Sequence, residues 1–398
     1  MELEQILNRA VVEIIVREEL IARLKEGRPL RLKQGFDPTR PDIHLGHAVG
    51  LRKLRQFQQL GHKVVLIVGD WTAQIGDPSG QSATRTMLSA EEVQANARTY
   101  MEQFFKIVDK ERTEVYWQSE WYAKFGLADV IALTSRFTVA QMLAREDFAK
   151  RYAAGNPITI TELLYPLMQA YDSVMVQADV EFGGTDQKFN CLVGRELQGM
   201  VGQRPQDVLL VPILVGTDGV NRMSKSLGNY IGITEPPDQM YGKVMSLPDH
   251  VMIDYFTLVT DVPEEEIAAF RTMLSDPSFN PKSLKQRLAR DIVSQFHGAE
   301  AARRAEEEFV RIFEKRELPS EIPVVLLSRD WFAKPVFPAD LLVESKLAAS
   351  RAEARRLVAQ GGVKFEGLRL PDEPFILLPG GTLQVGRRRF VRLLEKES

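Results

Sequence analysis

The sequence is short of cysteine, of long apolar stretches and of net charge, and each shortage removes a class of protein. A single cysteine, Cys191, among 398 residues rules out an intrachain disulfide framework and fits a reducing cytoplasm. No apolar run approaches the length of a membrane helix. The first residues, Met1–Gln5, are acidic and begin an amphipathic pattern, so we expect neither a signal nor a transit peptide. The sequence therefore predicts a cytoplasmic protein with no membrane partner.

The net charge of −3 argues against a protein that binds nucleic acid over its whole surface. Residues 338–398 differ from the rest of the chain. Eleven Lys and Arg against eight Asp and Glu give them a charge of +3, which leaves −6 for the remaining residues. A modestly basic tail on an acidic body favours a local contact with nucleic acid. A solvated domain of mildly positive charge explains the same numbers.

Apolar runs with the composition of strands alternate with helical patterns in the first half of the chain. The runs cover residues 30–36, 63–70, 113–119, 178–184 and 208–216. This alternation is typical of an α/β fold with a parallel sheet. Residues 4–26 have the pattern of one helix closed by Gly27, and residues 236–314 that of successive helices. Residues 321–337 contain prolines and no sustained helical period, which predicts a linker before a small separate unit at 338–398.

Two histidines, His44 and His47, lie between the end of the first of these strands and the start of a helix, in the stretch "DIHLGHAVG". Backbone N–H groups and the helix dipole favour anions at such a place. A metal pair is a weaker reading, because no third ligand follows at metal-site spacing. On these residues alone, ordinary helix-start positions and a nucleotide site are equally good interpretations.

A second segment, "NRMSKSLGN", follows the last strand and favours the nucleotide site. Arg222 and Lys225 are three residues apart, and both can reach a polyphosphate. Alone, such a loop is usually a solvated turn. Together with a histidine pair at the first strand–helix junction, it predicts that phosphates bind between the two segments.

In this order, "HLGH" and "RMSKS" resemble the two signatures of class I aminoacyl-tRNA synthetases. The segments "GFDPTRPDIHLGH", "IGDPSG", "LLYPLMQAYDSV" and "GGTDQKFN" further resemble the tyrosyl-tRNA synthetases, and the likeness covers nearly the whole chain. The resemblance implies a Rossmann-like catalytic domain at 1–231, an α-helical domain on the anticodon side of the tRNA at 232–320, and the linker at 321–337. It implies that 338–398 form a small α+β RNA-binding domain of the ribosomal-protein type.

The resemblance implies activation of L-tyrosine by ATP and transfer of tyrosine to the 3′-terminal adenosine of tRNA(Tyr). Gly46 would let the nucleotide approach the backbone, and His44 and His47 would contact the phosphates. Lys225, supported by Arg222, would close over the departing pyrophosphate. The resemblance places four further residues at the ATP: Asp186, Gln187, Met223 and Ser224. It implies Mg²⁺ carried by ATP, no tightly bound cofactor and no metal held by the protein.

Tyr165, Gln169 and Asp172 stand at i, i+4 and i+7 of one expected helix, so their polar groups share a face. The polar groups of such a face either bind a ligand or form hydrogen bonds with one another, and the pattern favours a ligand. By resemblance, Asp172 accepts the tyrosine phenol, while Tyr165 and Gln169 hold the ammonium group with Asp77. The same site would include Asp37.

Lys33 is a departure from the commoner family pattern, which has a tyrosine there that shares the phenol contact. A lysine cannot replace a phenol as donor and acceptor. Either Asp172 recognises the phenol with less help from other residues, or Lys33 pairs with Asp172. The departure resembles a second bacterial subtype of the family.

The C-terminal residues predict a capped helix that begins after Ser350 and carries Arg351, Arg355 and Arg356. Arg387, Arg388 and Arg389 are further candidates for contact with tRNA phosphates. An edge strand protected from aggregation by charge is a serious alternative for those three.

Residues 135–152 resemble the segment through which the family forms a homodimer. The expected apolar contacts are Phe137, Val139, Met142, Leu143 and Phe148, although a buried helix within one chain would look the same.

Three rival functions remain at this stage. A tryptophanyl enzyme shares the superfold, but Asp172 suits a phenol. Nucleotidyltransferases with a related histidine turn lack the lysine loop and the basic tail. An RNA-binding regulator on an inactive synthetase scaffold would not need His44, His47 and Lys225 intact.

Overall fold

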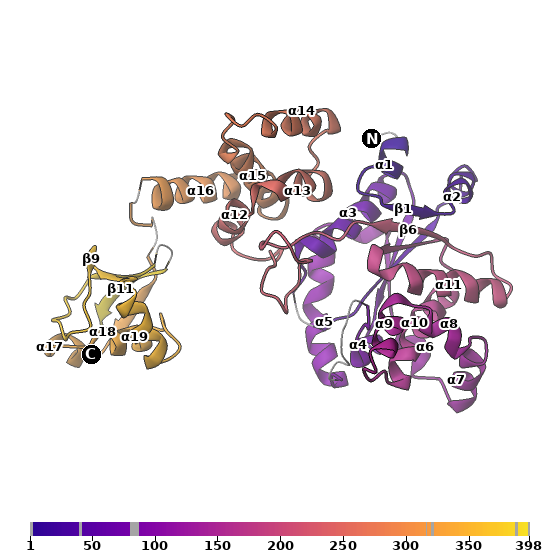
Figure 1. Ribbon diagram of the computed structural model, residues 1–398, viewed down its shortest axis with the longest axis horizontal. Helices are drawn as coiled ribbons and strands as arrows, with labels where there is room; N and C mark the ends of the chain where they lie inside the picture. Colours follow the sequence, from indigo (N-terminus) through magenta and orange to yellow (C-terminus); the bar gives the residue numbers. More distant parts are fainter. Residues whose placement is uncertain are drawn as a thin grey trace. The chain divides into compact units, whose positions relative to one another are not determined.

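The computed structural model describes residues 3–39, 42–79, 87–315, 317–319, 322–386 and 389–396. The chain divides into two compact units, Met1–Ala299 and Glu300–Ser398 (Figure 1). Among the described residues, no helix has the length and apolar character needed to cross a bilayer.

The first unit is built on a six-stranded sheet in the order β1-β6-β5-β2-β3-β4. Its strands are β1 (Glu13–Ile15), β2 (Arg31–Phe36), β3 (Lys63–Val68), β4 (Thr113–Trp117), β5 (Val180–Gly184) and β6 (Asp207–Val211). All pairs among β2–β6 are parallel, and only β1 runs antiparallel, beside β6. The predicted α/β class and all five predicted strands are confirmed. The strand order reverses between the neighbouring strands β2 and β5. Open α/β sheets bind ligands at the carboxyl ends of the strands at such a point.

The prediction of one helix over residues 4–26 is wrong. The structure has α1 (Leu3–Asn8), then β1, then α2 (Arg17–Leu24). The intervening residues 11–16 read "VVEIIV", and β-branched side chains fit a strand better than a helix. The edge of β6 supplies the partner, with Glu13 opposite Leu210. Pairing with a distant strand therefore overrides the local helical pattern.

Helices cover both faces of this sheet. The longest are α3 (Leu45–Gln59), α5 (Ala90–Phe104), α10 (Ile160–Met175) and α11 (Lys188–Met200). Shorter helices are α4 (Thr72–Ile75), α6 (Ser119–Tyr122), α7 (Leu127–Thr134), α8 (Val139–Leu143) and α9 (Glu146–Ala153). Val64–Val68 of β3 are all buried, as expected for a strand covered on both faces.

After β6 the chain is helical, as predicted for residues 236–314. The helices are α12 (Pro237–Met245), α13 (Met252–Val259), α14 (Glu264–Leu274), α15 (Lys282–His297) and α16 (Ala299–Phe309), followed by a π-helical turn at Val310–Glu314.

The second unit has a five-stranded sheet in the order β7-β11-β10-β8-β9. The strands are β7 (Val324–Leu327), β8 (Val363–Phe365), β9 (Leu368–Arg369), β10 (Thr382–Val385) and β11 (Arg389–Glu395). They pack with α17 (Asp330–Ala333), α18 (Pro338–Glu344) and α19 (Arg351–Ala359) over a core that includes Leu341, Leu383 and Leu393. Residues 321–337, where we expected a linker, contribute β7 and α17. The predicted cap is present, since Ser350 Oγ accepts the Glu353 N–H at 3.2 Å.

Candidate active site

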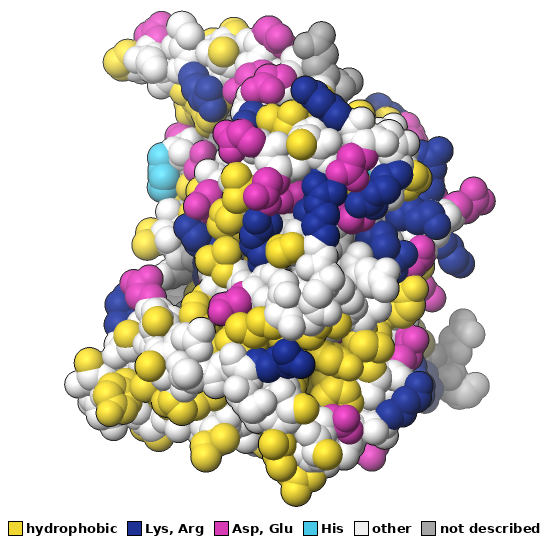
Figure 2. Space-filling model, turned by 90° about the vertical axis from the view of Figure 1, so that its right-hand side faces the viewer, with side chains coloured by type: hydrophobic (Ala, Val, Ile, Leu, Met, Phe, Trp, Pro, Cys, Tyr) yellow, Lys and Arg dark blue, Asp and Glu magenta, His cyan; other side chains and the backbone are white. Residues whose placement is uncertain are grey.

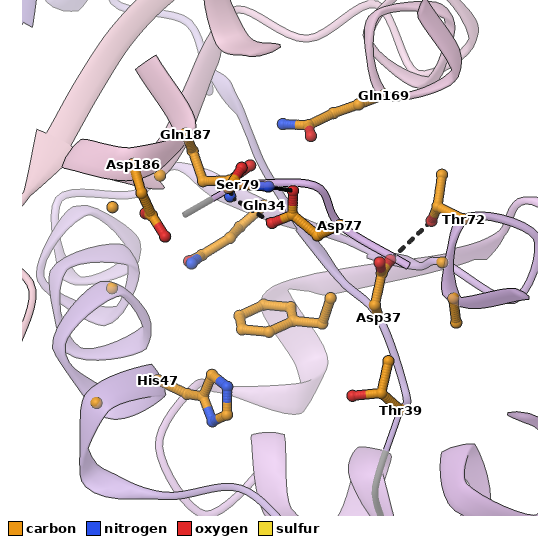
Figure 3. Close-up of a pocket in the computed structure, with 18 of the residues that line it drawn as sticks. Gln34, Asp37, Thr39, His47, Thr72, Asp77, Ser79, Gln169, Asp186 and Gln187 are labelled. Atoms are coloured by element: carbon orange, nitrogen blue, oxygen red, sulfur yellow. Dashed lines mark hydrogen bonds between the residues drawn. The ribbon is translucent and has the colours of Figure 1, made fainter. Parts of the chain in front are cut away.

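A cavity of about 620 Å³ opens at the carboxyl ends of β2 and β5, the position expected from the strand order (Figure 3). Its volume lies in the usual range for a small-molecule site. Both motif segments and the polar face of α10 contribute to its wall. The sequence-predicted residues that line it are Asp37, His44, Gly46, His47, Asp77, Tyr165, Gln169, Asp172, Asp186, Gln187, Arg222, Met223, Ser224 and Lys225.

The two histidines form a stacked pair at the first turn of α3. Their ring centroids are 3.8 Å apart, and the backbone N–H of His44 donates to His47 Nδ1 at 3.2 Å. Because Nδ1 accepts, the neutral His47 ring carries its proton on Nε2. Burial, and then the charge of Lys225, lower the pKa of His47 to about 3. Burial also lowers the pKa of His44, so at neutral pH the pair offers N–H donors and no full charge.

Gly46 keeps this turn open. A Cβ at position 46 would lie 2.9 Å from two atoms of the His44 ring and 3.6 Å from Met223 Cβ. Any side chain there would displace the histidine or enter the cavity. The missing side chain therefore gives a ligand access to the backbone of the first helical turn.

The loop of residues 222–226 brings two cations to the same cavity. Lys225 Nζ lies 5.6 Å from the centre of the Tyr100 ring, and Arg222 Nη1 lies 3.4 Å from Asp186 Oδ2. The Ser224 N–H donates to Asn229 Oδ1 at 2.8 Å, which ties the loop to its own end. Tyr100, from α5, is a lining residue that the sequence did not reveal.

Asp172 is buried, with 2% of its surface exposed, and two side-chain N–H groups donate to its carboxylate. Gln118 Nε2 donates to Oδ2 at 2.7 Å, and Trp121 Nε1 donates to Oδ1 at 3.1 Å. Gln118 in turn accepts the Thr72 N–H at 2.9 Å, which fixes the orientation of its amide. Burial raises the pKa of Asp172 to about 7, against the opposing charge of Lys33 and the two hydrogen bonds.

Sequence reasoning missed Gln118 and Trp121. A signal was present, because Gln118 directly follows β4 and the carboxyl ends of parallel strands share one edge.

Two further carboxylates, Asp37 and Asp77, border the cavity. Tyr165 Oη donates to Asp37 Oδ2 at 2.8 Å, and Gln187 Nε2 donates to Asp77 Oδ2 at 2.7 Å. Thr72 Oγ1 also donates to Asp37, at 2.7 Å (Figure 3). Two acidic groups on the cavity wall suit a positively charged ligand group.

Lys33 is the predicted site residue that the structure places elsewhere. Its side chain is fully buried, and it does not line the cavity. Lys33 Nζ pairs with Glu181 Oε1 at 2.8 Å and not with Asp172. Of the two alternatives for Lys33, the structure does not show the pair with Asp172, because Glu181 lies directly opposite Lys33 on β5.

Comparison with known proteins identifies the family. The model of a family described as tRNA synthetases class I (W and Y) matches residues 25–314. A tyrosine–tRNA ligase of Dehalococcoides mccartyi is 59% identical over 388 residues, which cover 98% of this chain and 97% of the relative. One of Thermotoga maritima is 54% identical, with 98% and 96% covered. This chain belongs to the tyrosine–tRNA ligase family of class I synthetases.

Solved structures of the tyrosine–tRNA ligase family share the fold. A C-terminally truncated mitochondrial tyrosyl-tRNA synthetase of Aspergillus nidulans has a TM-score of 0.64 at 22% identity and covers 78% of this chain, with 93% of its own length matched. The Archaeoglobus fulgidus enzyme complexed with L-tyrosine has a TM-score of 0.62 at 23% identity, with 76% and 98% covered. The resemblance inferred from the motifs is thus confirmed at the level of family and fold.

The remaining predicted residues lie in the second unit of this ligase-family chain. Arg351, Arg355 and Arg356 are exposed on α19, and Arg351 Nε pairs with Asp340 at 2.8 Å. Arg387 and Arg388 lie outside the described residues. Across the part of the chain that is described, no group of three or more His, Cys, Asp or Glu side chains could hold a metal ion.

Proposed function

We propose that this chain is a tyrosine–tRNA ligase, which activates L-tyrosine with ATP and transfers it to the 3′-terminal adenosine of tRNA(Tyr). The observation that carries the proposal is a single cavity lined by both signature segments and by the buried Asp172. The curated relatives at 59% and 54% identity bear the same name.

Tyrosine selectivity rests on Asp172 in this proposal. Its carboxylate accepts the phenol hydroxyl, while Gln118 and Trp121 hold it in place. Phenylalanine would bury the same carboxylate without that partner, and a stranded buried acceptor costs free energy, a rule that this enzyme family itself exemplifies. The ammonium group of the substrate lies among Tyr165, Gln169 and Asp77.

Activation needs positioning and charge stabilisation more than proton transfer. The tyrosine carboxylate is already ionised, so it attacks the α-phosphate of ATP and pyrophosphate leaves. Neutral N–H groups of His44 and His47 and the cations Lys225 and Arg222 stabilise the charge that develops. Asp186 and Gln187 contact the ribose side of the nucleotide. Mg²⁺ arrives with ATP as part of the substrate, and the enzyme holds no cofactor tightly.

We further propose that the second half of the chain serves tRNA. The α-helical segment 232–320 faces the anticodon side, and residues 338–398 bind RNA through the exposed arginines of α19. The single buried Cys191 is compatible with the reducing cytoplasm, where we place the enzyme.

A homodimer is proposed through the apolar surface around α7 and α8. Met142 and Phe148, expected in that surface, are buried inside the chain, because they pack inward from α8 and α9. Val139 is 64% exposed. Hydrophobic side chains gather in the lower part of the face in Figure 2, at the height of α7 in Figure 1. The exposed apolar residues of this region are Leu127, Ile131, Val139, Tyr152 and Ile160.

The test of the proposal is ATP–pyrophosphate exchange with each proteinogenic amino acid in turn, followed by charging of tRNA(Tyr). We expect exchange with tyrosine alone and charging of that tRNA. Exchange driven by tryptophan, or none with tyrosine, would contradict the assignment.

A further inference from the structure

Lys33 and Glu181 form a buried ion pair directly behind the cavity. They are register partners on the adjacent strands β2 and β5, and their side chains are 0% and 1% exposed. Neither residue lines the cavity. Breaking a buried pair leaves an uncompensated charge, whereas neutralising both members is often tolerated. A buried ion pair is therefore weak evidence that it stabilises the fold, and its presence here calls for another explanation.

Every donor of the Lys33 ammonium group is used. It donates to Glu181 Oε1 at 2.8 Å, to Ser173 Oγ at 2.7 Å and to the backbone oxygen of Gln169 at 2.7 Å. Glu181 Oε2 accepts from Ser173 Oγ at 3.3 Å and from Gln206 Nε2. The pair thus binds the middle of α10 through both its backbone and its side chains.

Glu181 also fixes the side-chain amide of Gln169. Gln169 Nε2 donates to Glu181 Oε1 at 3.1 Å, and an ionised carboxylate can only accept. The amide nitrogen is therefore held at the carboxylate, and the oxygen is turned away from it. Figure 3 shows this oxygen on the side of the amide toward Asp77. A neutral group at position 181 would not impose that choice.

A second group sets the same orientation from the other side. Asn190 Nδ2 donates to Gln169 Oε1 at 3.0 Å. Asn190 Oδ1 accepts from Arg145 Nη1 at 3.1 Å, and a guanidinium can only donate. One end of this chain of two amides is Glu181, which can only accept, and the other is Arg145, which can only donate. Each amide between them therefore has one favourable orientation.

We infer that the buried Lys33–Glu181 pair is a positioning device that holds the Gln169 amide with its oxygen toward the substrate ammonium group. The inference rests on the proposed function, in which Gln169 binds that ammonium. An ammonium group only donates hydrogen bonds, so it needs the oxygen; the flipped amide would present N–H groups to a cation. Lys33 is the cationic partner of Glu181, and the hydrogen bond to Glu181 keeps the amide from flipping.

The glycine at position 194, on α11, makes room for this cluster. A Cβ there would lie 2.7 Å from Gln206 Nε2, 3.1 Å from Ser173 Oγ and 3.2 Å from Glu181 Oε2. The close approach of α11 to these polar groups is possible only without a side chain.

The test compares three kinetic constants in a double variant, Lys33→Met with Glu181→Gln, which leaves no unpaired buried charge. We expect the KM for tyrosine in pyrophosphate exchange to rise about tenfold or more, since a hydrogen bond to a charged group is weakened. The KM for ATP should stay within about twofold. So should the inhibition constant of 3-(4-hydroxyphenyl)propanoate, which is tyrosine without its amino group.

The matched control is Arg23→Met with Asp207→Asn. That pair is equally buried, with Arg23 Nε 2.9 Å from Asp207 Oδ2, and neither residue lines the cavity. It should leave all three constants unchanged. If the Lys33→Met and Glu181→Gln double variant does not fold, Lys33→Gln with Glu181→Gln carries the test, because both side chains stay polar and neither keeps a charge.

An unchanged tyrosine KM in a folded variant would overturn the inference, and so would a parallel change in all three constants, which marks a general structural effect. Failure of the proposed function looks different: the unaltered enzyme would then show no exchange with tyrosine.

Discussion

Tyrosine activation should weaken in mild acid because Asp172 takes up a proton. Burial raises the pKa of this carboxyl to about 7, and both of its oxygens already accept an N–H group. The phenol needs a carboxylate acceptor, and the protonated acid is a much weaker one. At pH 6 only about a tenth of the free enzyme would carry the carboxylate, so kcat/KM for tyrosine should be about tenfold lower than at pH 8.

The assay is pyrophosphate exchange at saturating ATP between pH 5.5 and 8.5, with kcat/KM measured for tyrosine and for phenylalanine. The acid limb should appear for tyrosine only, because phenylalanine makes no hydrogen bond to Asp172. Asp172→Asn should abolish the limb and much of the preference for tyrosine, since the side chain at 172 no longer titrates.

The raised pKa of Asp172 also affects folding stability, but in the opposite direction: low pH weakens tyrosine activation and strengthens folding. A folded pKa near 7 against an ordinary value of 3.8 means that the folded state binds the extra proton. The stability that this proton gives is complete below about pH 4 and is lost as pH rises to about 7. A shift of about three units corresponds to about 4 kcal/mol. Relative to Asp172→Asn, the wild type should therefore lose unfolding free energy across this window.

Two results would refute this reasoning. One is an acid limb for tyrosine that survives in Asp172→Asn, which would assign the proton to another group. The other is a difference in unfolding free energy between wild type and Asp172→Asn that does not change between pH 4 and pH 7.

Lys225→Ala should slow tyrosyl-adenylate formation by about a hundredfold or more and leave tyrosine affinity nearly unchanged, as pre-steady-state kinetics can show. Arg355→Glu with Arg356→Glu should reduce charging of tRNA and leave pyrophosphate exchange intact; equal losses in both assays would contradict an RNA role for α19. Arg151→Met should cost about 3–5 kcal/mol in urea unfolding, because it strands the buried carboxylate of Glu162, 2.6 Å away; a smaller loss would mean that water reaches the pair.

The fold class and the motif segments could be predicted because their signals are local. The strands β2–β6 follow from short apolar runs that alternate with helical patterns, and "HLGH" and "RMSKS" carry their chemistry in a few consecutive positions. The polar face of α10 follows from helical spacing alone. Each of these features depends on neighbours in the sequence.

The residues that surround the site are brought together by the fold. The spacing of residues along the sequence does not reveal such contacts. Lys33 pairs with Glu181 because β2 lies beside β5, a strand 148 positions further along the chain. Gln118 and Trp121 reach Asp172 because the end of β4 meets α10. The strand β1 was missed for the same reason, since the edge of β6 decides its conformation.

The most direct measurement of the central claim is a crystal structure with a non-hydrolysable analogue of tyrosyl-adenylate. We expect the phenol oxygen within hydrogen-bonding distance of Asp172, the ammonium group at the Gln169 oxygen, and the adenosine over Gly46 between the two signature segments. A phenol that lies away from Asp172, or an adenosine bound outside the cavity, would contradict this claim.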